Sequence, residues 1–285
     1  MAPMNALTLG GSRNIGYYSS VRLLDAGWTV TFLLRNPSVF DADETIQKYV
    51  KSGKALLLKG DALVEQDVKR AWEEAASHGP EGKVDLLLFT VGGTPKISVR
   101  RGVYLTPDNL VTQSLLNVLR TMPPTSKQPL PRIITISSTG LTKTSHESVP
   151  LLLKPMYSLL LANPHKDKVG AERVMSHVCG WNWNPVDGEP EENILSKGWQ
   201  DLPGLPARGS LRDVVLVIRP ALLTDGECVA EDRKKGKKPA YRVQDVNDGE
   251  ISGWTVSRKD VAHFVAQAVT ERWDEYKGKR VNIAY

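Results

Sequence analysis

The chain has 285 residues, a net charge of +5 and two cysteines. This length can bury one large core, so residues 1–285 are expected to form a single domain. No apolar run approaches the ~20 residues of a membrane helix. Because the sequence starts with a predicted strand, we expect no cleaved signal peptide. With too few cysteines for a disulfide framework and no His/Cys cluster at metal-ligand spacing, we expect a cytoplasmic protein without a metal site.

A glycine-containing turn near the N-terminus joins a short apolar run to the start of an amphipathic helix. Gly10 permits a sharp turn, Gly11 lets the backbone approach a ligand, and Gly16 allows the helix to pack closely on a sheet. Free N–H groups at a helix start favour an anion, so the turn is typical of a loop that holds a dinucleotide diphosphate. A tight connection without a ligand is the alternative. The predicted loop comprises Gly10, Gly11, Ser12, Arg13, Asn14, Ile15 and Gly16.

Apolar strand-like runs alternate with helical patterns along the rest of the chain. This alternation predicts an α/β fold with a doubly wound, mostly parallel sheet, the Rossmann fold, with a small excursion on the substrate side. The predicted helices are Tyr17–Ala26 and Val64–His78, and the predicted later strands are Trp28–Leu34, Ala55–Leu58, Val84–Thr90, Ile133–Ser137, Val214–Ile218 and Arg280–Ala284.

Arg35 follows the second predicted strand, where a protein that prefers NAD usually presents an acidic residue to the adenosine ribose. A guanidinium binds a phosphate bidentately, and Arg13 in the glycine turn could add a second cation. We therefore predict NADP as the cofactor. In the alternative interpretation both arginines are solvated surface residues.

Polar or small residues follow three further strands, at the edge where ligands bind in such sheets. Asp61, followed by Ala62, could accept a hydrogen bond from the adenine, cap the next helix, or do both. Val91, Gly92 and Gly93 would let the chain pass beside the cofactor. Ser137 and Ser138 place hydroxyls where a carbonyl or the nicotinamide amide could lie.

Together these segments resemble the short-chain dehydrogenase/reductase superfamily, and more closely its atypical NmrA-like members known from fungi. The turn is similar to Thr-Gly-x-x-x-Gly-x-Gly, with Leu9 for the threonine and Asn14 for the middle glycine. By this resemblance Asp61 contacts adenine, and Ser137 or Ser138 is the family serine. The segment from Arg219 to Gly226 resembles an element that passes near the nicotinamide, which implies that Pro220, Ala221, Leu222 and Leu223 back that ring.

The sequence departs from the family at the catalytic tyrosine. Active members carry a tyrosine four residues before a lysine, whose charge lowers the tyrosine pKa. Lys168 is the counterpart of that lysine and would bind the nicotinamide ribose, but Pro164 stands in the tyrosine's place and is typical of the first residue of a helix. Glu172, one turn later, is predicted as the ion-pair partner of Lys168. The candidates for catalysis are Ser137, Ser138, Lys168, Tyr157 and His165.

Two regions, 181–209 and 227–252, are predicted as insertions or substrate-side loops. Trp181, Trp183 and Trp199 make the first a substrate lid or a segment that packs on the surface against the last strands. The second is expected to form a hairpin or irregular excursion beside the substrate. Its basic run, residues 233–238, favours a solvated loop over a nucleic-acid patch, because acidic residues precede it and no aromatic residues interleave with it.

These patterns predict an NADP-dependent oxidoreductase that reduces a carbonyl, iminium or enone in a small organic molecule. A non-catalytic NADP-sensing regulator of NmrA type and a non-redox cyclase or isomerase are the alternatives. The expected partner is a small-molecule substrate, with neither nucleic acid nor membrane. A homodimer or a regulatory protein partner is left open by the sequence.

Overall fold

The computed structural model describes residues 4–93, 96–98, 102–104, 106–126, 128–141, 162–232, 239–249, 251 and 253–285. Within them, eight strands form one sheet in the order β10-β12-β8-β7-β4-β1-β2-β3. Neighbouring strands are parallel, except that β10 runs antiparallel to β12. The predicted α/β fold with a mostly parallel sheet is therefore confirmed. The strands are β1 (Asn5–Leu9), β2 (Thr29–Leu34), β3 (Ala55–Lys59), β4 (Leu86–Phe89), β7 (Arg132–Ile136), β8 (Val215–Pro220), β10 (Arg242–Asp245) and β12 (Lys279–Ala284).

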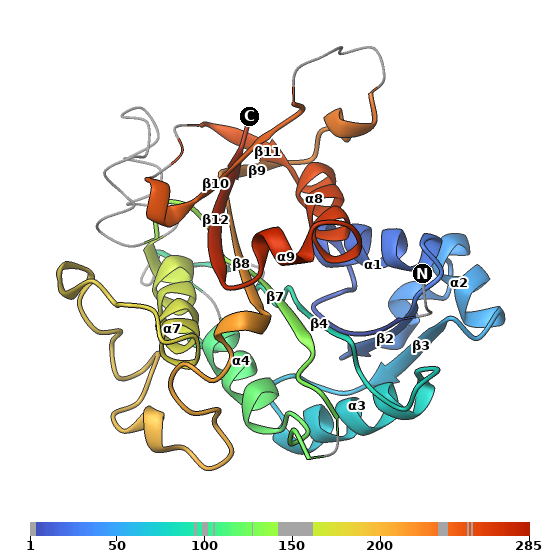
Figure 1. The fold of residues 1–285 in the computed structure, drawn as a ribbon, viewed down its shortest axis with the longest axis horizontal. Helices are drawn as coiled ribbons and strands as arrows, with labels where there is room; N and C mark the ends of the chain where they lie inside the picture. The colour runs from blue at the N-terminus through green and yellow to red at the C-terminus, as the bar shows by residue number, and fades with distance from the viewer. Residues whose placement is uncertain are drawn as a thin grey trace.

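Helices cover both faces of this sheet (Figure 1). Successive strand residues point to opposite faces, so Ala6 belongs to one core and Leu7 to the other. Because both faces are buried, the strands are almost continuously apolar, which made them recognisable in the sequence. None of the helices in the described part of the chain is long and apolar enough to cross a membrane. On one face lie α1 (Asn14–Asp25), α2 (Glu44–Lys51), α8 (Arg258–Thr270) and α9 (Trp273–Tyr276), and on the other α3 (Glu65–His78), α4 (Leu110–Arg120) and α7 (Ala162–Val178).

Two small sheets accompany the large one. The antiparallel pair is β5 (Lys96–Ser98) with β6 (Gly102–Tyr104), and the parallel pair is β9 (Leu222–Thr224) with β11 (Thr255–Ser257). The second pair follows β8 and leads directly into α8. It therefore brings the start of α8 to the edge of the large sheet where the parallel strands end (Figure 1).

Helix α1 begins three residues earlier than the sequence predicted, at Asn14 rather than Tyr17. Asn14 has a φ of +57°, in the left-handed region that asparagine tolerates better than most residues. This conformation lets the chain pass from the glycine turn into the helix without an intervening loop. The turn and the first residues of the helix therefore form one structural unit.

Residues 181–209 pack against α4 and α7 (Figure 1). Trp199 is only 4% exposed and lies edge-on to His177 of α7, with ring centroids 5.2 Å apart. Arg120 of α4 donates from Nε to the carbonyl of Pro203 at 2.8 Å. These contacts favour surface packing over a lid for the segment. It packs on α4 and α7 as well as on β12, whose Arg280 lies 5.1 Å from the centre of the Trp181 ring.

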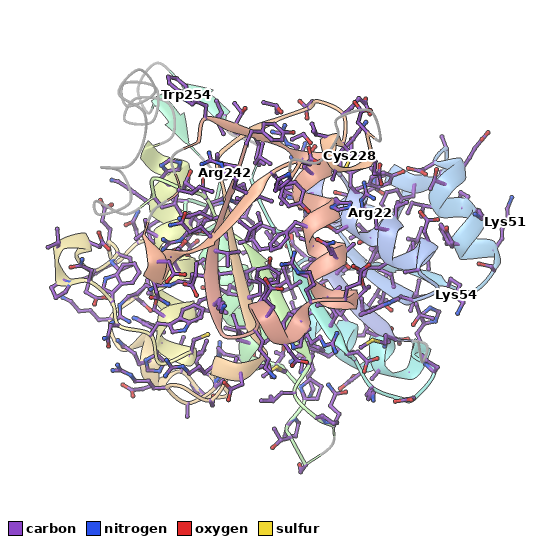
Figure 2. The ribbon with its side chains drawn as sticks, turned by 45° about the horizontal axis from the view of Figure 1, so that its top comes forward. Arg22, Lys51, Lys54, Cys228, Arg242 and Trp254 are labelled. Carbon is purple, nitrogen blue, oxygen red and sulfur yellow. The ribbon has the colours of Figure 1, made fainter. Side chains whose placement is uncertain are left out.

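The described part of 227–252 contains a strand of the large sheet rather than a separate excursion. β10 pairs with β12 in antiparallel register, with Arg242 opposite Ala284. Arg242 also donates from Nη2 to the carbonyl of Tyr285 at 2.7 Å, at the outer edge of the sheet (Figure 2). The basic run at 233–238 lies outside the described residues.

Candidate functional site

A cleft of about 740 Å³ lies where the parallel strands end. Its volume is within the range of ligand pockets, roughly 300–1,000 Å³. The loops after β1, β2, β3 and β4 form one part of its wall, and β7, α4, α7, β9 and α8 form the rest. The lining residues are Gly10, Ser12, Arg13, Asn14, Ile15, Gly16, Leu33, Leu34, Arg35, Asn36, Val39, Gly60, Asp61, Ala62, Thr90, Val91, Gly92, Gly93, Leu110, Ser114, Ile136, Lys168, Leu223 and Arg258.

Close packing around the glycine turn fixes the floor of the cleft. A Cβ atom at Gly10, which has a φ of +83°, would lie 2.5 Å from the carbonyl carbon of Thr90. A Cβ at Gly16 would lie 2.3 Å from Thr90 Oγ1 and 2.6 Å from the carbonyl oxygen of Gly10. At Gly11 the Cβ would meet Phe32 Cδ1 at 2.8 Å, inside the core. All three glycines are thus required for α1 to reach this position on the sheet.

The start of α1 is suited to an anion. The first N–H groups of an α-helix have no partner within the helix. The N-cap residue, Arg13, makes no side-chain capping hydrogen bond, and the first turn of α1 contains no acidic residue. A negatively charged ligand could accept these hydrogen bonds and would be stabilised by the helix dipole.

Two exposed arginines, Arg13 and Arg35, line the cleft near the end of β2. Asp61 lines the same region, and its Oδ1 accepts a hydrogen bond from the N–H of Leu63 at 3.0 Å. The N-cap of α3 is Val64, so the prediction that Asp61 caps this helix is wrong. The short turn made by Asp61 holds its carboxylate at the cleft instead.

Lys168 lies at the other end of the cleft, on α7. Its Nζ donates to the carbonyl oxygen of Ser137 at 3.0 Å. Burial lowers the pKa of Lys168 to about 8, although the carboxylates of Glu172 and Asp167 oppose this shift. Asp167 itself accepts hydrogen bonds from the backbone N–H groups of Val111 and Thr112 at 2.7 and 2.8 Å. The start of α4 therefore holds α7 in place one residue before Lys168.

A buried ion pair lies beneath Lys168. Arg219 of β8 donates from Nε to Glu172 at 2.8 Å and makes a second bond to the same carboxylate. Burial opposes ionisation of Glu172, but the Arg219 guanidinium holds the pKa of this carboxyl below its usual value. The prediction that Glu172 pairs with Lys168 is wrong, because the guanidinium from the sheet takes both carboxylate oxygens. The Ser137 hydroxyl also donates to Glu172, so it is turned away from the cleft.

Comparisons with known proteins agree with this geometry, although no protein-family model matches the sequence. The chain is 29% identical to the reductase pytE of Aspergillus terreus over 273 residues, which is 92% of this chain and 90% of the other. A mutant short-chain dehydrogenase/reductase of Serratia marcescens superposes with a TM-score of 0.59 at 17% identity, over 100% of this chain and 97% of that one. For a short-chain dehydrogenase from Burkholderia cenocepacia in complex with NADP, the TM-score is 0.56 at 17% identity, over 99% and 96%.

The chain has the fold of a short-chain dehydrogenase/reductase. In that fold the structure brings most of the predicted cofactor-binding residues to one cleft, and Leu223 reaches it from the β9 side. Four predicted cofactor-binding residues and the two predicted catalytic serines do not line it. They are Gly11, which packs in the core, Pro220, Ala221 and Leu222, which lie against neighbouring strands, and Ser137 and Ser138.

The remaining predicted catalytic residues besides Lys168 are His165 and Tyr157. His165 is half-buried on α7 and does not line the cleft, and Tyr157 lies outside the described residues. Sequence reasoning missed Asn36, Thr90, Leu110, Ser114 and Arg258 as cleft residues. Asn36 and Thr90 could have been found because they follow strands β2 and β4, as Arg35 and Val91 do. Leu110, Ser114 and Arg258 come from helices whose approach to the cleft depends on tertiary packing.

Proposed function

We propose that this protein is an NADP-dependent reductase of a small organic substrate that carries a carbonyl, iminium or conjugated alkene. One arrangement supports the proposal most strongly. A single cleft joins the uncapped start of α1 and the guanidinium of Arg35, at one end, to the ammonium of Lys168 at the other. The name of the reductase that resembles the chain and the NADP held by one structural neighbour are consistent with it.

The residues of the cleft fit a phosphorylated dinucleotide. The close packing of Gly10 and Gly16 against Thr90 leaves no space for a side chain at either position. Because both residues are glycine, no side chain covers the helix start, and a ligand can reach its N–H groups. Ser114 Oγ is buried and has no hydrogen-bond partner among the described residues, although it lines the cleft. A buried hydroxyl without a partner costs free energy, which a bound polar ligand would offset.

The expected roles follow from these positions. NADPH, when bound, supplies the hydride. The first N–H groups of α1 hold its diphosphate, and Arg13 and Arg35 bind the 2′-phosphate, which a carboxylate at the end of β2 would repel. Lys168 binds the nicotinamide ribose and holds a proton at Nζ that it can donate to a substrate oxygen. The Glu172–Arg219 ion pair fixes Ser137, whose carbonyl orients that Nζ.

The test is the consumption of NADPH absorbance with a panel of aldehydes, iminium ions and enones. Turnover of at least one class, and its loss in Lys168→Met, is the expected result. Disappearance of a substrate at constant NADPH absorbance would instead identify a non-redox enzyme. Calorimetry that detects no binding of NADPH or NADH at millimolar concentration would overturn the proposal altogether.

A second candidate function is a non-catalytic, NADP-sensing regulator of NmrA type. The observation that favours it is Pro164, which stands one turn before Lys168 on α7 and has no ionisable group. Tight NADP binding without turnover of any compound in the panel, together with co-purification of a partner protein, would favour this candidate over the reductase.

A further inference from the structure

Arg258 brings a cation to the cleft from a direction that none of the predicted cationic residues uses. Arg35 approaches from the end of β2, on one side of β1 in the sheet. Arg258 is the first residue of α8, which follows the β9–β11 pair and so approaches from the β8 side. The start of α1 lies between the two arginines, because it follows β1.

Contacts between α8 and α1 keep Arg258 near the anion-binding end of α1. Lys259, the next residue, has its Nζ 6.0 Å from the centre of the Tyr18 ring, in the second turn of α1. Further along α1, Arg22 forms an ion pair with Glu231, which lies on the segment after β9. The two helices therefore lie side by side (Figure 1). Their first residues, Asn14 and Arg258, both line the cleft.

Arg258 already forms an ion pair with a carboxylate, that of Asp225, which is almost fully exposed. Its Nη1 lies 2.7 Å from Oδ1 of Asp225, and the two side chains are 23% and 85% exposed. The guanidinium thus borders the cleft while its carboxylate partner stands in solvent. Exposed ion pairs contribute little free energy, so a polyanion in the cleft could displace Asp225 at low cost.

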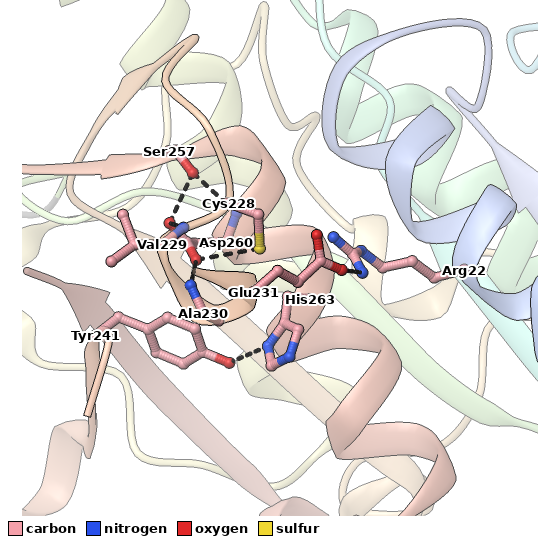
Figure 3. Close-up of polar contacts among 9 residues, drawn as sticks. All are labelled: Arg22, Cys228, Val229, Ala230, Glu231, Tyr241, Ser257, Asp260 and His263. Atoms are coloured by element: carbon pink, nitrogen blue, oxygen red, sulfur yellow. Dashed lines mark hydrogen bonds and ion pairs between the residues drawn. The ribbon is translucent and has the colours of Figure 1, made fainter. Parts of the chain in front are cut away.

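The segment that carries Asp225 is anchored beyond it by Asp260 of α8. This buried carboxylate accepts hydrogen bonds from the N–H groups of Val229 and Ala230, at 3.1 and 2.9 Å, and from Ser257 Oγ at 2.8 Å (Figure 3). Cys228 also donates to it from Sγ at 3.4 Å. Because these bonds hold residues 228–230 to the start of α8, Asp225 stays within reach of Arg258.

We propose that Arg258 binds the diphosphate of the dinucleotide, and that Asp225 competes with this diphosphate for the guanidinium. The proposal rests on the proposed function, because it requires a dinucleotide in the cleft. It assigns Arg258 to a group that NADPH and NADH share, in contrast to Arg35, which is assigned to the 2′-phosphate that NADPH alone carries.

The test measures the dissociation constants of NADPH and NADH by calorimetry for the full chain and its variants. Arg258→Ala should weaken both cofactors by the same factor, about ten-fold or more, because a charge-assisted hydrogen bond is lost. Asp225→Asn should tighten both by about two- to five-fold, since the competing carboxylate loses its charge. In the Arg258→Ala/Asp225→Asn double variant the gain should disappear.

Glu227→Gln is the matched control. Glu227 pairs with Lys259 at 2.7 Å, is 88% exposed and lies two residues from Asp225, but neither member of this pair lines the cleft. It should leave both affinities unchanged. Equal tightening by Asp225→Asn and Glu227→Gln, or unchanged affinities in Arg258→Ala, would overturn the assignment while leaving the reductase proposal standing. If the unaltered chain binds neither dinucleotide, the proposed function fails and this assignment fails with it.

Discussion

Arg35 is the residue on which the preference for NADP over NAD depends most directly. Replacing it with alanine should weaken NADPH binding by about ten- to hundred-fold, the loss expected for charge-assisted hydrogen bonds to a phosphate. NADH affinity should stay unchanged, because NADH lacks the 2′-phosphate. Calorimetry with both cofactors measures this. Arg272→Ala, which removes a surface arginine paired with Glu275, is the control. An equal loss for both cofactors would contradict the assignment.

Lys168 should make cofactor binding depend on pH. Burial lowers the pKa of its ammonium to about 8, so the charge is lost as the pH rises through that value. NADPH affinity should fall over the same range, because the neutral amine attracts the ribose and phosphates less strongly. Lys168→Met should bind NADPH more weakly and without this pH dependence. Calorimetric titrations at several pH values measure both curves.

The lowered pKa of Lys168 also affects stability, which should rise with pH where NADPH affinity falls. The pKa of Lys168 in the folded protein, about 8, lies below its ordinary value of 10.5, so the unfolded chain binds more protons between these values. The free energy of unfolding of the cofactor-free protein should therefore gain a rising contribution from Lys168 as the pH increases from about 8 to about 10. Urea titrations should show this contribution in the wild type and not in Lys168→Met.

At the scale of elements, the segment 181–209 is expected to stabilise the fold rather than to cover the substrate. Trp199 is almost completely buried against α7. Trp199→Ala should cost about 3–5 kcal/mol in the free energy of unfolding, as large-to-small changes in cores do. It should leave NADPH affinity unchanged in the folded fraction. The control is Trp254→Ala, since Trp254 is 48% exposed and its loss should cost little. A large change in affinity without loss of stability would restore the lid hypothesis.

Most of the fold could be predicted because its signals are local. The glycine turn, Arg35, Asp61 and Val91–Gly93 all follow apolar strands, and parallel strands bring their ends to one edge of the sheet. The boundaries of strands were within two residues of those observed, since burial on both faces makes each strand a continuous apolar run.

The rest depended on contacts between elements far apart in the sequence. Glu172 seemed paired with Lys168 by helical spacing, but Arg219, 47 residues away, takes its carboxylate. The antiparallel pairing of β10 with β12 could not be read from a strand of four residues with mixed polarity. The place of Arg258 at the cleft could not be predicted, because it requires α8 to pack on α1.

For the whole molecule, cofactor binding and stability are linked. NADPH at a hundred times its dissociation constant should raise the free energy of unfolding by about 2.7 kcal/mol, because the ligand binds the folded chain alone. Thermal scans should show a midpoint higher by roughly 5 °C, which is this free energy divided by the entropy of unfolding expected for a chain of this length. At that same NADPH concentration the shift should shrink in Arg35→Ala. An unchanged midpoint at saturating NADPH would contradict binding in the cleft.

The packing around the glycine turn also affects which residues would persist in evolution if cofactor binding were lost. Side chains at Gly11 and Gly16 would collide with Phe32 and Thr90 whether or not a nucleotide is present. A descendant of this protein that had abandoned its cofactor would still have to keep both glycines to fold. We therefore expect the glycine signature to outlast the activity. Arg35 is exposed and is not required by packing, so it would be substituted first. Its presence is therefore the better indication that the site binds a cofactor.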